Sequence, residues 1–327
     1  MSTDGQKTVL IGIDEAGLGP ILGPLTISAA GFIVPNESLK DDMWQLLSDA
    51  TKKTKLRLAG KMLITDSKKA YTSKAKNPKK HLEKTVLTTL AAMNQRPSTL
   101  DQLLNTLCSK CAPRLPKYKW YNDLASRPLG HNTDEIDICA QAFSRALKKN
   151  NMTIAFLKSV CLDVAHFNDM IEKVRNKSTV SFSAVCSLVH DVFRSFQNAN
   201  YQFVIDRQGG RTNYTQLLRK MFPDMSLEVI KQNDKVSSYE LADSDKTARI
   251  HFIVKADDKS LPTALASMTS KYLRELLMDC INEYFIGHCE DLKPTAGYFT
   301  DGKRFLEDLK TQAPNIPYDP NHLIRCR

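Results

Sequence analysis

The sequence contains no apolar run of the roughly 18 residues that a membrane-spanning helix needs. Its first residues, Met1 to Lys7, are polar and lack the basic and then apolar pattern of a secretory signal. It also contains no low-complexity tract and no repeat with a period of about 20–50 residues, which excludes a solenoid. These absences predict a cytoplasmic protein with no membrane partner.

Cysteine is not arranged as in a secreted domain held together by disulfides. The eight cysteines are scattered, and only Cys108 and Cys111 have the spacing of metal ligands. A structural zinc site needs four ligands, and no second Cys-x-x-Cys or His-x-x-x-His follows. We therefore expect ordinary free thiols in a reducing compartment, with a zinc site as the alternative.

The motifs of several common catalytic classes are also missing. None of the seven histidines lies beside a Gly-x-Ser-x-Gly turn. No cysteine has the local signature of a catalytic nucleophile. The segment from Gly17 to Gly19 lacks both the third glycine of a dinucleotide-binding turn and the Gly-Lys-Ser/Thr of a phosphate-binding loop. Serine, cysteine and nucleotide-dependent chemistry are therefore disfavoured.

What the chain does have is ordinary globular composition and a concentrated positive charge. Its 327 residues, 42% hydrophobic and 25% charged, suffice for one large domain or two ordinary ones. The net charge is +10, and twelve basic but only two acidic residues lie between Lys52 and Lys84. A local basic patch on an otherwise balanced chain favours a polyanionic partner. A solvated lysine-rich face is the alternative.

Runs of β-branched and apolar residues alternate along the chain with segments of helical spacing. They predict strands at 8–14, 25–34, 61–65, 153–163, 201–206, 226–231 and 249–254, and helices at 38–50, 79–94, 134–150, 181–198, 212–222, 262–285 and 301–310. This alternation predicts an α/β fold with a mixed sheet flanked by helices. We expect one domain over residues 1–260, carrying an insertion at about 96–133, and a helical extension over residues 261–327.

Three of the predicted strands end in carboxylates. Asp14 and Glu15 follow one apolar run, Asp206 follows a second, and Asp257 and Asp258 follow a third. If these strands share a sheet, the carboxylates cannot all stay ionised without a cation. Hard divalent cations such as Mg²⁺ prefer oxygen ligands. The spacing alone leaves open that these are separate aspartates in loops.

The residues around these carboxylates resemble a known family in five blocks. The blocks are Gly12 to Pro20 with Gly23-Pro24, the Asp-Ser-Lys-Lys segment 65–69, Val204 to Asp206, Val254 to Asp257 with 264–275, and Gly297-Tyr298 followed by Asp301. Their order and character are similar to those of the type 2 ribonucleases H (ribonuclease HII). Residues 91–200 contain little that matches.

The resemblance implies a ribonuclease H-like fold and a hydrolase that cleaves phosphodiester bonds. Such an endonuclease cuts RNA in RNA–DNA hybrids or ribonucleotide-containing DNA and leaves 5′-phosphate and 3′-hydroxyl ends. It depends on Mg²⁺ or Mn²⁺, with two ions per site, and we expect a monomer. Position by position, the implied catalytic and metal-binding residues are Asp14, Glu15, Asp206 and Asp257, with Asp258 as the alternative to Asp257.

The expected substrate contacts extend around these acids. The glycines of the turn leave room for a nucleic-acid backbone to reach main-chain amides, and such amides can recognise a ribose 2′-hydroxyl. The C-terminal helical extension is expected to complete the substrate cleft. The predicted substrate-binding residues are Gly17, Leu18, Gly19, Lys68, Arg207, Lys271 and Tyr298.

The chain departs from the family at several positions. Leu18 stands where the family has an arginine that contacts phosphate, which puts the preference for a single embedded ribonucleotide in doubt. We expect Arg207, just after Asp206, to supply a phosphate contact instead. Two other functions stay open: a nuclease with a different nucleic-acid substrate, and a non-catalytic nucleic-acid-binding protein on the same scaffold.

Overall fold

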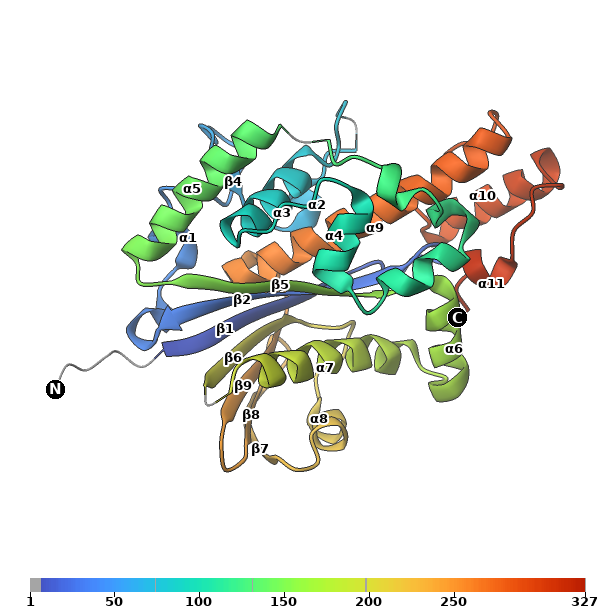
Figure 1. The fold of residues 1–327 in the computed structure, drawn as a ribbon. Helices are drawn as coiled ribbons and strands as arrows, with labels where there is room; N and C mark the ends of the chain where they lie inside the picture. Colours follow the sequence, from blue (N-terminus) through green and yellow to red (C-terminus); the bar gives the residue numbers. More distant parts are fainter. Residues whose placement is uncertain (1–6, 74, 131, 198, 327) are drawn as a thin grey trace.

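The computed structural model describes residues 7–73, 75–130, 132–197 and 199–326. Its centre is a seven-stranded mixed sheet in the order β5-β2-β1-β6-β9-β8-β7 (Figure 1). The strands are β1 (Lys7–Ala16), β2 (Leu25–Pro35), β5 (Thr153–Leu162), β6 (Asn200–Asp206), β7 (Ser226–Gln232), β8 (Val236–Ala242) and β9 (Thr247–Ile253). Two short strands, β3 (Thr51–Lys52) and β4 (Met62–Leu63), pair separately.

The strands that carry the acidic residues are neighbours and point the same way. β1 pairs in parallel with β6, and β6 pairs in parallel with β9. Ile13 lies opposite Ile205, and Asp206 lies opposite Ile253. The carboxyl ends of the three strands therefore meet at one end of the sheet, as expected. β2 runs antiparallel to both β1 and β5, so β1 and β2 form a hairpin.

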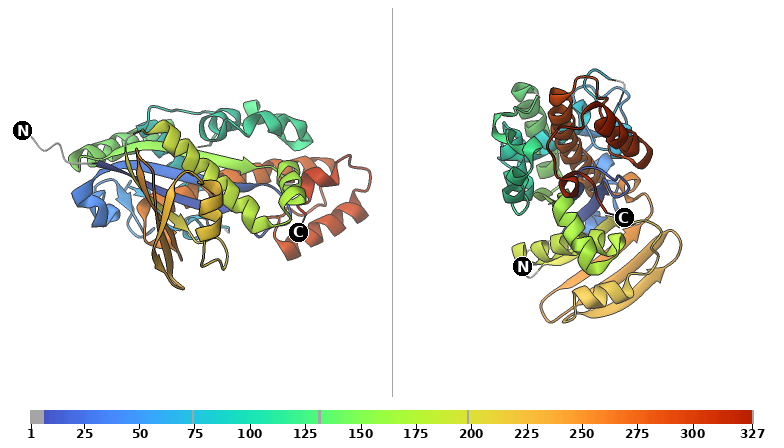
Figure 2. Two further views of the ribbon diagram at one scale, coloured as in Figure 1. Left: turned by 90° about the horizontal axis from the view of Figure 1, so that it is seen from below. Right: turned by 90° about the vertical axis from the view of Figure 1, so that its right-hand side faces the viewer.

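Helices cover both faces of the sheet (Figures 1 and 2). The core on one face includes side chains of α1 (Met43–Leu46), α2 (Ser67–Ala70), α3 (Lys80–Ala92), α4 (Leu100–Cys108), α5 (Thr133–Lys149), α9 (Leu261–His288), α10 (Phe299–Gln312) and α11 (Pro320–Leu323). The core on the other face includes side chains of α6 (Val164–Val174), α7 (Lys177–Ser195) and α8 (Thr215–Met221). The α/β class with a mixed sheet, flanking helices and C-terminal helices is therefore confirmed.

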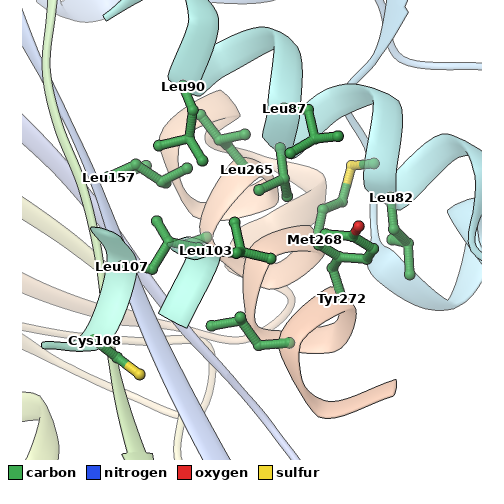
Figure 3. Packing of buried hydrophobic residues seen from close by; sticks show 14 of the residues in the cluster. Leu82, Leu87, Leu90, Leu103, Leu107, Cys108, Leu157, Leu265, Met268 and Tyr272 are labelled. Atoms are coloured by element: carbon green, nitrogen blue, oxygen red, sulfur yellow. The ribbon is translucent and has the colours of Figure 1, made fainter. Parts of the chain in front are cut away.

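Alternation of side chains along β1 divides the apolar residues between two cores. Leu10 belongs to the core beneath α9, whereas Val9 and Ile11 belong to the core beneath α7. Figure 3 shows how the first core is filled: leucines of α3 and α4 meet Leu265 and Met268 of α9. Burial of this apolar surface is the main force that fixes α9 on the sheet.

Gly12 permits the closest approach between the sheet and a helix. A β-carbon there would lie 2.0 Å from the backbone nitrogen of Thr263 and 2.1 Å from the carbonyl carbon of Pro262. Only glycine fits such a contact, because any side chain would push the start of α9 off β1. The start of this helix is thereby held beside the end of β1, where the acidic residues lie.

Several expected elements differ in the structure. The helix expected at 38–50 is wrong: a 3₁₀ helix, Asn36–Lys40, is followed by the short α1, whose N-cap is Asp42. The helix expected at 181–198 starts earlier, at Lys177, and Asn198 lies outside the described residues. The sequence patterns did not predict α4, α6 or β8. Residues 96–133, expected as an insertion, contribute buried leucines of α4 to the first core.

A disulfide joins Cys108 and Cys111 at the end of α4. The expectation of free thiols is wrong for this pair, because the helix end brings their Cα atoms to 5.7 Å, within the range that a disulfide spans. Cys139, Cys161, Cys186, Cys280, Cys289 and Cys326 are free. In the described parts of the chain, no helix is both long and apolar enough to span a membrane.

Candidate active site

A pocket of about 300 Å³ lies where β1, β6 and α9 meet. Residues from distant parts of the chain line it, and ten of them were predicted from the sequence. These are Asp14, Glu15, Gly17, Leu18, Gly19, Lys68, Asp206, Asp257, Lys271 and Tyr298. The structure therefore brings together all four predicted acids and six of the seven predicted substrate contacts.

Asp14 and Glu15 are consecutive on β1, so their side chains leave the strand toward opposite faces. The main-chain carbonyl of Asp14 accepts a hydrogen bond from Ser270 of α9. Burial raises the pKa of Asp14 well above its usual value, and the charge of Asp206 raises it further, while a hydrogen bond from Ser267 lowers it. The Asp14 carboxyl group is therefore poorly stabilised as an anion in the absence of a cation.

Glu15 is held from the other face of the sheet. Its Oε2 accepts hydrogen bonds from Ser181 of α7 at 3.0 Å and from the side-chain amide of Gln208 at 2.9 Å. Burial raises the pKa of Glu15, and these two hydrogen bonds oppose that rise. Ser181 and Gln208, 2.6 Å apart, thus fix the orientation of the Glu15 carboxylate. Sequence reasoning assigned no role to either residue.

Asp206 ends β6 and is tied to the chain beyond β9. Its Oδ1 accepts a hydrogen bond of 2.7 Å from the main-chain N–H of Ala256. Burial raises the pKa of Asp206, this hydrogen bond lowers it, and the charge of Glu15 raises it again. The hydrogen bond places Asp206 next to the 3₁₀ helix Ala256–Asp258, which carries the fourth acid.

Asp257 and Asp258 face different surroundings. Asp257 lines the pocket, and burial followed by the charges of Asp66, Asp206 and Asp258 raises its pKa to about 6. Asp258 is absent from the pocket lining and forms an ion pair of 2.6 Å with Lys69, which lowers its pKa. The geometry therefore favours Asp257 over Asp258 as the fourth acid of the pocket.

A fifth carboxylate, Asp66, lines the same pocket and was not predicted as a site residue. Its Oδ1 caps α2 by accepting a hydrogen bond of 2.8 Å from the main-chain N–H of Lys68. Its charge is the largest electrostatic contribution to the raised pKa of Asp257. The signal was present in the sequence, because Asp66 opens the Asp-Ser-Lys-Lys segment.

The glycine turn after β1 presents free main-chain donors to the pocket. Within the described residues, the N–H groups of Gly17, Leu18 and Gly19 donate no hydrogen bond. Gly17 has a φ of +95°, a conformation that residues with a β-carbon rarely adopt. Leu18 is half-buried and packs against the second core. The turn can therefore donate hydrogen bonds to a ligand in the pocket.

Arg274 of α9 anchors this turn from beneath. It is 1% exposed, and its guanidinium donates hydrogen bonds to the carbonyls of Pro24, Leu22 and Ala296. It thereby links the glycine turn to the segment that carries Tyr298. Arg274 appeared in the sequence only as part of a helical motif, and nothing there showed that it would be buried under the turn.

The segment before α10 forms the other wall of the pocket. The Gly297 carbonyl accepts hydrogen bonds from the N–H groups of Ile21 at 2.8 Å and Leu22 at 3.2 Å. Asp301 holds the same segment by accepting a hydrogen bond of 2.6 Å from Thr295. Tyr298 itself is 48% exposed at the pocket rim. An aromatic ring at this position is available to stack on a sugar or base.

Lys68 and Lys271 are the predicted cations that reach the pocket. Lys68 is exposed, whereas Lys271 is mostly buried and forms an ion pair of 2.6 Å with Glu275. The ammonium group of Lys271 also lies 4.8 Å from the ring centroid of Tyr71. Lys68 therefore presents the more available positive charge.

Arg207 does not reach the pocket. Its guanidinium donates hydrogen bonds to the main-chain carbonyls of Asn233, at 3.0 Å, and Asp234. These carbonyls belong to the turn between β7 and β8. The side chain of Arg207 therefore points toward that turn and not into the pocket. The expectation that Arg207 supplies a phosphate contact is not supported by this placement.

The chemistry of the pocket suits a hard divalent cation, but its side chains are not gathered around one point. Carboxylate oxygens are the donors that Mg²⁺ and Mn²⁺ prefer. Burial, and then the charges of neighbouring acids, raise the pKa of Asp14, Asp206 and Asp257, and a bound cation would oppose both effects. However, among the described residues no group of three or more His, Cys, Asp or Glu side chains is arranged to hold a metal ion.

Fold and pocket together define an α/β protein with a carboxylate-lined pocket at the ends of adjacent parallel strands. No family model matches the chain, and no curated protein matches it significantly. RNase HII from Archaeoglobus fulgidus, solved as a PCNA complex, is 13% identical over 98% of this chain and 94% of that one, with a TM-score of 0.42. Bst-RNase HIII in complex with Mn²⁺ is 12% identical over 98% of this chain and 67% of that one, with a TM-score of 0.43.

A third solved structure, ribonuclease H2 from Pyrococcus horikoshii OT3, is 13% identical. The comparison covers 96% of this chain and 92% of that one, with a TM-score of 0.42. At such low identity and TM-score, the likeness carries no argument about the activity or the partners of this chain. What this chain does has to be argued from its own pocket.

Proposed function

We propose that this protein is a metal-dependent endonuclease that cleaves the RNA strand of RNA–DNA hybrids. The observation that carries the proposal is the meeting of Asp14, Glu15, Asp206 and Asp257 in one pocket beside a turn with free main-chain amides. A non-catalytic binding protein gains nothing from buried carboxylates that repel one another. Their retention in a pocket next to lysines fits phosphodiester hydrolysis.

The four acids are the proposed ligands of Mg²⁺ or Mn²⁺. When bound, a pair of such ions supplies an activated water and stabilises the leaving oxygen. The protein's own contribution is orientation: Ser181 and Gln208 fix Glu15, and the N–H of Ala256 fixes Asp206. Asp66 adds further negative charge beside Asp257, which strengthens the attraction for a cation.

The glycine turn is the proposed element that distinguishes RNA from DNA. The N–H groups of Gly17, Leu18 and Gly19 can donate hydrogen bonds to a ribose 2′-hydroxyl, which DNA lacks. Arg274 holds the turn in place from below, and Tyr298 stands at the rim as a stacking surface. Lys68, which lines the pocket and is exposed, is the proposed contact to the scissile or an adjacent phosphate.

Residues 261–327 form the proposed second half of the substrate cleft. α9 contributes Ser267, Lys271 and Arg274 to the pocket, and Tyr298 lies just before α10. Because these residues line the same pocket as the acids of β1 and β6, we propose that the C-terminal helices complete the substrate cleft. On this proposal, the parts of the chain before and after residue 260 contribute to one site.

A cleavage assay with purified protein tests the function. The substrates are a labelled RNA–DNA hybrid and a DNA duplex with one embedded ribonucleotide, each with Mg²⁺ or Mn²⁺. Asp14→Asn, treated identically, controls for contaminating nuclease. We expect the wild-type protein to cut the continuous hybrid and leave 5′-phosphate ends, and the variant to leave it intact.

The other results would each change the proposal in a defined way. Tight binding of both duplexes without cutting would replace the nuclease by a nucleic-acid-binding protein. Cutting of structured RNA but not of either duplex would keep the chemistry and change the substrate. Equal cutting by wild type and Asp14→Asn would remove the proposed site altogether.

A further inference from the structure

The lysine-rich stretch of the sequence forms an exposed surface beside the pocket, which we call the basic face. Its members are exposed side chains of the β3–β4 connection, of α2, of the loop that leads to α3 and of the first residue of α3. They are Lys53, Lys55, Arg57, Lys68, Lys69, Lys76 and Lys80. Among the described residues, only Lys69 of this set forms an ion pair with an acid, Asp258. The basic face therefore keeps most of its positive charge.

Hydrogen bonds hold the basic face together as one surface. Lys52 donates to the main-chain carbonyls of Leu56 at 3.2 Å and Arg57 at 2.8 Å, which braces the β3–β4 connection. Lys55 donates to the hydroxyl of Thr72 at 2.6 Å, which ties this connection to the loop after α2. Two segments that are separate in the sequence thus present their lysines together.

The basic face begins at the pocket itself. α2 starts at the pocket acid Asp66, and its exposed residues Lys68 and Lys69 follow at once. Lys53 donates to the main-chain carbonyl of Asp258, the neighbour of the pocket acid Asp257. A chain of phosphates leaving the pocket on this side would therefore pass directly onto these lysines.

The positive charge of this region lowers the pKa of a nearby histidine. Burial lowers the pKa of His81, and the charges of Lys55, Lys80 and Lys84 lower it further. These lysines come from the β3–β4 connection and from α3, so they act on one point from two elements. Like charges in such proximity favour a polyanion that neutralises several of them at once.

The rim of the pocket around Tyr298 has a different character. Tyr298 and Phe299 are 48% and 41% exposed there, and Lys303 lies 4.4 Å from the ring centroid of Phe299. Aromatic rings offer stacking to a sugar or base, whereas lysines offer charge to a phosphate backbone. The two sides of the pocket are therefore suited to different parts of a nucleic acid.

We infer that the basic face binds the sugar–phosphate backbone of the duplex arm that leaves the pocket on that side. The inference rests on the proposed function and specifies its substrate: a duplex that extends well beyond the cleaved nucleotide in one direction. Lysine and arginine contacts of this kind bind without sequence preference and release counterions, so the affinity depends strongly on salt.

Binding is measured by fluorescence anisotropy in an Asp14→Asn background, which prevents cleavage. The test variant is Lys55→Ala/Arg57→Ala/Lys80→Ala. The matched control is Arg219→Ala/Lys220→Ala/Lys231→Ala, which removes three exposed cations from α8 and β7, outside the pocket and the basic face. Each protein is titrated with a long hybrid at several salt concentrations, and with hybrids shortened from one end or the other.

We expect the test variant to lower the slope of log affinity against log salt by about two to three, since each lost phosphate contact removes about one. The control should leave the slope unchanged. Shortening one particular arm of the hybrid should weaken binding by the Asp14→Asn parent. The same shortening should have little effect on the test variant, whose binding is already weakened. The arm that behaves in this way is the one whose backbone crosses the basic face.

Two results would overturn the inference. They are equal losses in the test and control variants, or an unchanged salt slope in the test variant. These are distinct from failure of the proposed function. If the wild-type protein cuts hybrids while the test variant binds them normally, only the inference about the basic face is wrong. If no hybrid is cut by the wild type, the proposed function fails.

Discussion

Arg274 occupies the space that a side chain at Gly17 would need. A β-carbon on residue 17 would lie 2.8 Å from Cδ and 2.9 Å from Nε of Arg274, whose guanidinium is already bonded to main-chain carbonyls. The turn that offers its amides to the pocket therefore rests directly on a buried cation. Neither partner can change without disturbing the other.

Replacing Gly17 by alanine should destabilise the protein through this contact and through its positive φ. We expect Gly17→Ala to lower the free energy of unfolding by about 1–3 kcal/mol. Gly19→Ala is the control, because a β-carbon there meets nothing within 4 Å and its φ is not positive. Urea unfolding followed by tryptophan fluorescence measures both. Equal losses in the two variants would mean that Arg274 yields to the added methyl group.

Removing the side chain of Gln208 should loosen the hold on Glu15. The carboxylate would keep its hydrogen bond from Ser181 but lose the one from Gln208. Loss of a residue that orients a metal ligand typically weakens metal binding by about 10–100-fold. We therefore expect Gln208→Ala to raise the Mg²⁺ concentration for half-maximal cleavage at least tenfold, while Gln216→Ala on the surface of α8 does not. An unchanged Mg²⁺ dependence would contradict the orienting role.

The neighbours Asp257 and Asp258 should respond oppositely to neutralisation. The folded-state pKa of Asp257 is raised to about 6, so its charge destabilises the fold above that pH. This penalty develops as the pH rises from about 4 to 6, because only there does the folded state bind more protons than the unfolded state. In EDTA, Asp257→Asn should therefore raise the melting temperature at pH 7.5 and lose this advantage below pH 4.

Asp258→Asn supplies the control for that experiment. Its pKa is lowered by Lys69, so the ionised form is favoured in the folded state and its removal gives no gain in stability at pH 7.5. In the cleavage assay the variant with the higher melting temperature should be the inactive one. We expect Asp257→Asn to abolish cutting and Asp258→Asn to retain it. Loss of cleavage only in Asp258→Asn would exchange their proposed roles.

Leu18 is the position at which a phosphate contact can be added. It lines the pocket and is half-buried against the second core, so arginine would give up some packing there but add a cation at the pocket. A new charge-assisted hydrogen bond to phosphate contributes about 1.5–3 kcal/mol. We expect Leu18→Arg to bind the duplex with one embedded ribonucleotide at least tenfold more tightly, whereas Leu18→Met leaves binding unchanged. No gain would show that residue 18 faces no phosphate.

The sequence predicted the central elements because their patterns are strong. Thr8 to Asp14, Leu25 to Val34 and Tyr201 to Asp206 are dense in apolar and β-branched residues, and all three form strands. Pro262 correctly marked the start of α9. The convergence of the acids also followed, since strands that run parallel in one sheet end on the same side. The helix expected at 38–50 failed because Asp41 and Asp42 interrupt it and Asp42 caps a new one.

The support around the acids could not be predicted, because it depends on contacts between distant segments. Nothing local in the sequence shows that Gln208 meets Glu15 or that Arg274 lies beneath Gly17. For the same reason, the sequence did not predict that Asp66 lies in the pocket, and it wrongly suggested that Arg207 does. Asp66 reaches the pocket because α2 begins there, and Arg207 leaves it because carbonyls of the β7–β8 turn accept its guanidinium.

The last described residues of the chain close the wall around the glycine turn. The N–H of Arg325 donates to the carbonyl of Ile21 at 2.8 Å, and Leu22 pairs with Ile324 across a short β-bridge. These two segments lie at opposite ends of the described chain. The wall beside the glycine turn therefore forms only when the segments around residues 21 and 325, which are far apart in the sequence, have come together.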